Sequence, residues 1–165
     1  MIFQGLILTK TALEEIDQLS VKQNISLVSC HIQTLLEDTF YNMKKVRVLD
    51  LSSNNINNLP RNSFYGCVQL ETLSLSNNQI ERLIQSQFAP LNNLRLIDLS
   101  SNLLTSVDKN TFINLGPSLE TINLEDNQLH TMSEVSLLPL TGLQVWLNIP
   151  DAVFTTSVLG YPASS

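Results

Sequence analysis

The chain has 165 residues, of which 43% are hydrophobic and 15% are charged, and this composition excludes an intrinsically disordered protein. Its net charge is −6, and its nine lysines and arginines are scattered along the chain, which argues against nucleic acid as a partner. No apolar run reaches the roughly 18 residues of a membrane span. The first fifteen residues lack a basic leader and a small-residue cleavage site, so we interpret them as folded structure.

A repeated line of the form L-x-x-L-x-L-x-x-N-x-L organises residues 1–143. In chain order its copies begin near Phe3, Lys22, Val46, Leu70, Leu94 and Leu119. The three middle copies are 24 residues apart, the first is the weakest match, and the last is one residue late because of the Gly116-Pro117 turn. A fixed period of this length indicates one supersecondary unit stacked on copies of itself.

Within each copy, the L-x-L segment has the period of two that is typical of a short strand. The wider half of the four middle copies, those beginning at Lys22, Val46, Leu70 and Leu94, carries a phenylalanine, at Phe40, Phe64, Phe88 and Phe112. We expect this half to hold brief 3₁₀ or extended pieces and to curve the stack. The sequence therefore predicts an α/β solenoid of about six repeats, a curved horseshoe with a parallel sheet on its concave side.

Beyond Leu143 the repeat ends. Trp146 fills one more inward position, but Pro150 cannot continue a strand ladder because it lacks an N–H donor. We predict a degenerate last strand followed by a partly disordered tail over residues 144–165.

An asparagine recurs where each strand ends, at Asn54, Asn78, Asn102 and Asn127. A buried amide at this position both donates to and accepts from the backbone of adjacent turns. We expect these residues to form a structural asparagine ladder. Thr11 and Cys30 occupy the same position in the first two copies, so the ladder weakens toward the N-terminus.

These motifs resemble the leucine-rich repeat family over roughly Phe3 to Leu143. The 24-residue period and its phenylalanine are similar to the typical extracellular subclass found in Toll-like, chaoptin-like and slit-like ectodomains. The resemblance implies a horseshoe-shaped binding module at the cell surface or outside the cell. Family ectodomains carry cysteine-rich caps that this sequence lacks, so the chain resembles a fragment, an incomplete gene product or an uncapped form.

Outward strand positions are the candidate partner-binding residues. At one position opposite charges alternate from strand to strand, at Arg47, Glu71, Arg95 and Glu120. Such residues form cross-strand ion pairs, and we favour a self-satisfied solvated stripe over the border of a partner site. The middle of the concave face carries Asp50, Ser74, Asp98 and Asn123, and Glu125 extends the acidity. This pattern favours a basic protein partner.

Other polar residues give weaker signals. Asp50 and Asp98 have a spacing near that of the two carboxylates of inverting glycosidases. An open sheet has no enclosed pocket to raise the pKa of either carboxylate, so we expect no enzyme. His31 and His130 lack neighbouring ligands, so we expect surface histidines, and no metal or cofactor. Cys30 and Cys67 are expected to be buried free thiols. Asn24 begins the one N-glycosylation sequon.

These observations predict a non-enzymatic protein–protein interaction module of an extracellular recognition or adhesion protein. Three alternatives stay open. One is a fragment of an innate-immune or developmental receptor ectodomain. Another is an adhesive matrix protein that self-associates through uncapped ends. The third is a cytosolic adaptor, favoured by the missing signal sequence and the free cysteines.

Overall fold

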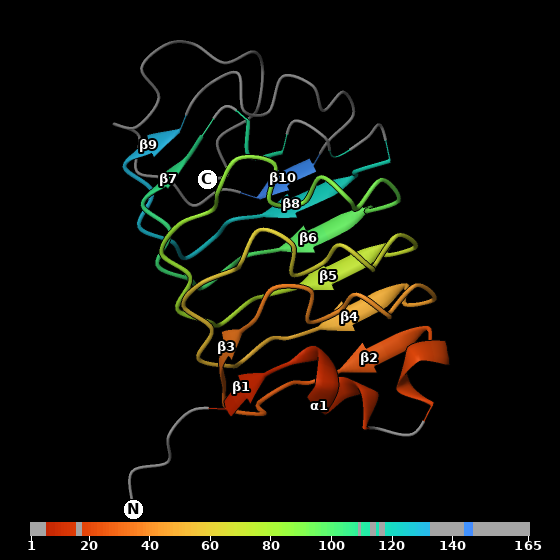
Figure 1. The fold of residues 1–165 in the computed structure, drawn as a ribbon. Coiled ribbons are helices and arrows are strands. Elements are labelled where there is room, and N and C mark those ends of the chain that lie inside the picture. Colours follow the sequence, from red (N-terminus) through yellow and green to blue (C-terminus); the bar gives the residue numbers. More distant parts are fainter. Residues whose placement is uncertain are drawn as a thin grey trace, which may run out of the picture.

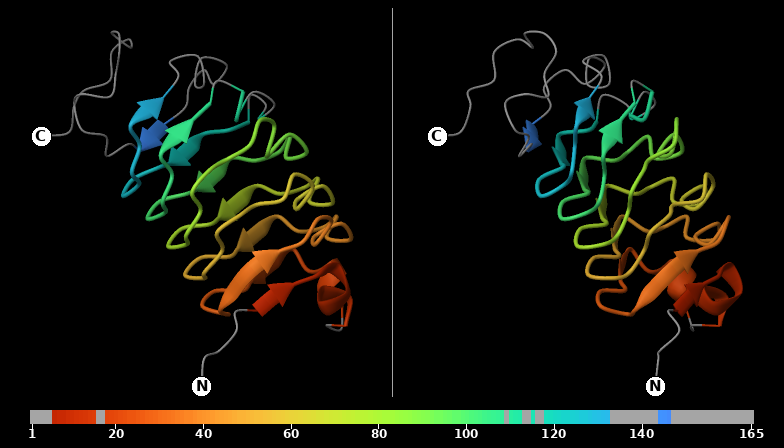
Figure 2. Two further views of the ribbon diagram at one scale, coloured as in Figure 1. Left: turned by 60° about the vertical axis from the view of Figure 1, so that its left-hand side comes forward. Right: turned by 90° about the vertical axis from the view of Figure 1, so that its left-hand side faces the viewer.

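A computed structural model describes residues 6–15, 18–108, 110–112, 115, 118–132 and 144–146 of the chain. These residues wind into a curved solenoid whose successive turns stack on one another (Figures 1 and 2). The predicted Gly116-Pro117 turn and the tail after Trp146 lie outside the described residues. No helix in the described ranges has the length and hydrophobicity needed to cross a bilayer.

One parallel sheet lines the concave side of the solenoid, as predicted. Its strands, in spatial order, are β10 (Gln144–Trp146), β8 (Thr121–Asn123), β6 (Leu96–Asp98), β5 (Thr72–Ser74), β4 (Val48–Asp50) and β2 (Asn24–Ser26). Pairing follows the repeat, because each residue lies opposite its counterpart in the next copy, as Leu49 does opposite Leu73. We call these six strands the concave sheet.

The N-terminal segment departs from the prediction that the copy beginning at Phe3 is a further turn of the same kind. β1 (Leu6–Leu8) pairs with β3 (Ile32–Leu35) and not with the concave sheet. This copy is only 19 residues long, too short for a full turn. Helix α1 (Lys10–Glu14), whose first turn is capped by Thr9, and the 3₁₀ helix η1 (Leu19–Val21) take up the remaining length.

This segment closes the N-terminal end of the stack. Leu8 of β1 and Leu13 of α1 are buried in the common core. The Leu8 carbonyl accepts hydrogen bonds from the Leu36 N–H at 3.3 Å and from the Thr39 hydroxyl at 3.2 Å. The stack therefore has an N-terminal cap that uses apolar packing and backbone hydrogen bonds.

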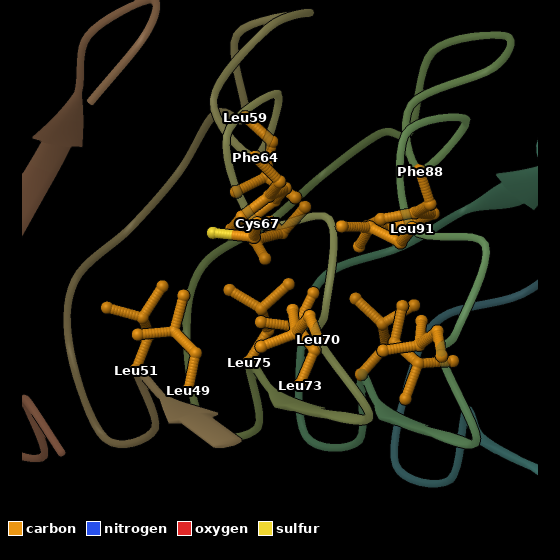
Figure 3. Close-up of a cluster of buried hydrophobic side chains, with 14 of the residues drawn as sticks. Leu49, Leu51, Leu59, Phe64, Cys67, Leu70, Leu73, Leu75, Phe88 and Leu91 are labelled. Atoms are coloured by element: carbon orange, nitrogen blue, oxygen red, sulfur yellow. The ribbon is translucent and has the colours of Figure 1, made fainter. Parts of the chain in front are cut away.

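The core runs through the whole described stack between the concave sheet and the convex turns. Inward leucines and isoleucines of each turn are buried, and a phenylalanine lies above them (Figure 3). The rings of Phe40, Phe64, Phe88 and Phe112 stack with centroid separations of 5.8, 6.3 and 6.0 Å. Two more extended pieces, β7 (Ser106–Val107) and β9 (Thr131–Met132), pair in parallel on the side of the solenoid.

The asparagine ladder is confirmed. Asn78 shows the pattern: its Nδ2 donates to the carbonyls of Leu51, Leu75 and Ser76, and its Oδ1 accepts from the Ile56 N–H at 3.0 Å. Asn54, Asn102 and Asn127 make the same set of bonds, each in its own turn. Each amide thus fastens its own turn to the preceding one.

The residue before each ladder position has a left-handed backbone. Ser29, Ser53, Asn77, Ser101 and Asp126 have φ between 51° and 56° although none is glycine. In the first four, the N–H donates to a carbonyl of the next turn, with distances of 2.9–3.2 Å. A second row of bonds therefore joins each of these four turns to its successor, and it offsets the strain of a positive φ.

The two cysteines differ, which corrects half of the prediction. Cys67 is buried, and burial raises the pKa of its thiol to about 12. Cys30 is exposed, and both thiols are free. Cys30 occupies the ladder position of the second copy, and because β1 pairs with β3, the described residues place no strand of the concave sheet before β2 to cover it. His31 and His130 are exposed, as expected.

Candidate functional site

The middle of the concave sheet carries a line of small polar side chains, which we call the central stripe: Asp50, Ser74, Asp98 and Asn123. These residues end β4, β5, β6 and β8 and lie directly opposite one another in the register of the sheet. All four are half-buried. The register therefore brings together the side chains that the sequence placed at the centre of the face.

Hydrogen bonds from the residues just after each strand hold the side chains of the central stripe in place. Asp50 Oδ1 accepts from the Ser52 N–H at 2.9 Å, and Asp98 Oδ1 accepts from both the N–H and the hydroxyl of Ser100, at 3.0 and 2.7 Å. Asn123 Oδ1 accepts from the Glu125 N–H at 3.0 Å. Within the described residues these bonds engage only Oδ1 of each aspartate, so Oδ2 remains available to a partner.

Sequence reasoning missed this positioning role. The signal was an Asp or Asn followed two residues later by a residue whose N–H donates to its Oδ1, the pattern of an Asx turn. It recurs at Asp50, Asp98 and Asn123. The carboxylates are therefore oriented before any partner arrives, and an asparagine at this position fulfils the same structural task.

A second line of side chains, which we call the charge row, precedes the same strands: Arg47, Glu71, Arg95 and Glu120. Arg47 Nη1 lies 2.6 Å from Glu71 Oε1, and Arg95 donates from Nε and Nη2 to Glu120 Oε1 at 3.0 and 2.7 Å. The described structure has no ion pair between Glu71 and Arg95. The predicted ladder is thus two separate pairs.

The electrostatics of the row follow this pairing. Hydrogen bonding and charge attraction from Glu120 raise the pKa of Arg95, and Glu71 adds a smaller attraction in the same direction. The side chains stay exposed at 49% and 36% in the first pair and at 58% and 59% in the second. Exposed pairs of this kind contribute little to stability.

Three further residues border the stripe. Leu96, the first residue of β6, directly follows Arg95 of the charge row, and this large apolar side chain is 37% exposed on the concave sheet. Glu125 is half-buried at the C-terminal end of the stripe, and Asn24 is exposed on β2 at the other end.

Across the described ranges, no group of three His, Cys, Asp or Glu residues is arranged to hold a metal ion.

Comparison with known proteins identifies the repeat. A family described as leucine rich repeat matches residues 23–80, 69–129 and 92–150. Comparison of the sequence with curated proteins gives no match. Among solved structures, the chain is similar to Toll in the Toll–Spatzle complex of Drosophila, with a TM-score of 0.71 and 26% identity over 84% of this chain.

Two other solved structures are similar over most of the chain. TLR13 in a complex with ssRNA13 has a TM-score of 0.66 and 26% identity over 78% of this chain. Internalin C2 from Listeria monocytogenes has a TM-score of 0.62 and 29% identity over 77%. The chain spans 18% of the Toll and TLR13 chains and 52% of the internalin chain.

Proposed function

The chain belongs to the leucine-rich repeat family, and from this premise we propose that it is a non-enzymatic module that binds another protein through its concave face. We place the module in an extracellular or cell-surface protein of recognition or adhesion. The likeness to Toll and TLR13 supports this placement, and it favours a receptor ectodomain as the larger context.

The central stripe is the observation that carries the proposal. Asp50 and Asp98 lie two strands apart, so about 9–10 Å separates them along the sheet. Between them Ser74 is small, which leaves room for an incoming side chain. Each carboxylate is oriented by its turn and has a free oxygen to accept a bond from a basic group. Two basic side chains of one partner segment fit this pair.

Charge also favours one of two classes of partner. TLR13 forms its printed complex with ssRNA13, and Toll forms one with Spatzle. The present chain has a net charge of −6, and the central stripe adds acidity at the proposed site. Phosphate groups would meet repulsion there, so we favour a protein partner with exposed lysine or arginine.

Asn24 fits the same arrangement as a glycosylation site. Its side chain is exposed on β2, the terminal strand of the concave sheet. A glycan on Asn24 stands at the N-terminal end of the face and leaves β5, β6 and β8 open. Endoglycosidase treatment of the protein secreted from eukaryotic cells tests this assignment, and an unchanged mass would contradict it.

A peptide-display selection tests the binding site. Random peptides are selected on the immobilised chain, and we expect enrichment of sequences with two basic residues. The Asp50→Asn/Asp98→Asn variant keeps the turn hydrogen bonds, because Asn123 makes the equivalent bond naturally. Its affinity for the selected peptides should fall about ten-fold or more through loss of two charge-assisted bonds.

A matched control removes the same charge elsewhere. Asp38 and Asp108 are exposed and lie outside the concave sheet. The Asp38→Asn/Asp108→Asn variant has the same net charge as the test variant, so its affinity should stay within about two-fold of the parent. Equal losses in both variants would show a general charge effect and would exclude the stripe as the site.

A further inference from the structure

The charge row reads plus, minus, plus, minus along four neighbouring strands. A second copy turned by a two-fold axis presents the same row in reverse order. Arg47 then faces Glu120 of the second copy, and Glu71 faces its Arg95. From this complementarity we propose that two copies of the chain associate along the charge row in an antiparallel, closed dimer.

The geometry places all four contacts in register at once. The residues of the row precede β4, β5, β6 and β8, which are consecutive neighbours in the concave sheet. Their spacing is the strand spacing of about 4.7–4.9 Å, and it is identical in both copies. The starts of these strands lie along one edge of the sheet, where the arrows of Figure 1 have their tails. The two-fold axis passes between Glu71 and Arg95.

The side chains of the row keep bonding capacity for a second partner. Each described ion pair engages only Oε1 of its glutamate, so Oε2 of Glu71 and Glu120 is open to an arginine of the other copy. A guanidinium has five N–H donors, of which Arg47 and Arg95 use one and two in these pairs. Their exposure, between 36% and 59%, makes them accessible.

Leu96 supplies an apolar contact near the centre. It follows Arg95 directly and is 37% exposed, so the axis brings it close to its counterpart in the second copy. An apolar centre surrounded by charged groups is the usual anatomy of a protein interface. Because exposed ion pairs contribute little each, the dimer is weak and salt-sensitive.

Sedimentation equilibrium over about 10 μM to 1 mM protein measures the association, in a range suited to weak complexes. We expect a monomer–dimer equilibrium that weakens several-fold when the salt concentration rises from about 50 to 500 mM. A constant monomer mass would overturn the proposal. Growth beyond the dimer would also overturn it, because association through the ends of the stack gives an open-ended chain of copies.

Charge-swap variants test the arrangement itself. Arg47→Glu/Glu71→Arg keeps the net charge and keeps both cross-strand pairs with opposite charges, but it changes the row to minus, plus, plus, minus. In the antiparallel arrangement every contact then joins like charges, so association should weaken about ten-fold or more. Arg95→Glu/Glu120→Arg gives plus, minus, minus, plus and should fail in the same way.

Two recoveries distinguish this mechanism from simple damage. The two swap variants are complementary to each other, so mixing them should restore a heterodimer. The quadruple variant Arg47→Glu/Glu71→Arg/Arg95→Glu/Glu120→Arg again alternates and should dimerise like the parent. Failure of both recoveries, or unchanged association of either swap variant, would overturn the proposal. Thermal unfolding verifies that each variant folds.

Leu96→Ser, which changes no charge, should also weaken the dimer, and an unaffected dimer would remove Leu96 from the interface.

Discussion

Replacing Asn78 by alanine removes one buried amide that joins two turns. The Ile56 N–H then loses its acceptor inside the protein, which costs about 1–3 kcal/mol. The carbonyls of Leu51, Leu75 and Ser76 each lose one bond but keep another, from Asn54, from Asn102 and from the Ser53 N–H respectively. We therefore expect the free energy of unfolding to fall by about 2–4 kcal/mol in total.

Urea unfolding followed by circular dichroism measures this loss against two references. Asn55 is exposed beside the ladder, and Asn55→Ala should change the free energy of unfolding by less than about 0.5 kcal/mol. Asn127 is half-buried, so water replaces part of its bonding and Asn127→Ala should cost about 1–2 kcal/mol. Equal losses for Asn78→Ala and Asn55→Ala would refute the ladder as a source of stability.

Four further results are expected. Phe88→Ala should lower the free energy of unfolding by about 3–5 kcal/mol in urea titration, because the ring is fully buried. Gly66→Ala places a Cβ 2.0 Å from the Tyr41 carbonyl oxygen, so the variant should lose at least about 1–3 kcal/mol by the same measure. A thiol reagent should label Cys30 in the native protein and Cys67 only after unfolding. Because burial raises the pKa of Cys67 to about 12, the unfolded chain releases this proton first, and stability relative to Cys67→Ala should fall as pH rises above about 9; parallel curves for the two proteins would contradict this.

The periodic part of the fold was predictable because each side chain there packs against the equivalent residues of the neighbouring repeats. The leucine positions, the stacked phenylalanines and the role of Asn78 depend only on offset within the repeat. Once the period is known, neighbouring turns must place these residues together. The same reasoning located Asp50 and Asp98 in one line on the concave face.

The non-periodic features could not be predicted in this way. A weak repeat match at β1 could not show whether this strand joins the concave sheet or pairs with β3. The outcome depends on how many residues α1 takes up between β1 and the next strand. The exposure of Cys30 follows from that choice. Which arginine pairs with which glutamate is decided by rotamers, since Glu71 has an arginine on both neighbouring strands.

The row of left-handed residues has a consequence for how this chain changes length. From Ser29 to Ser101, each of these N–H groups donates to the following turn, while each amide of the asparagine ladder reaches back to the preceding turn. Every interior turn of this region therefore presents the same donors and acceptors to its neighbours as the other interior turns do. A duplicated 24-residue unit finds matching partners on both sides, so gene duplication lengthens such a protein without redesign of its core.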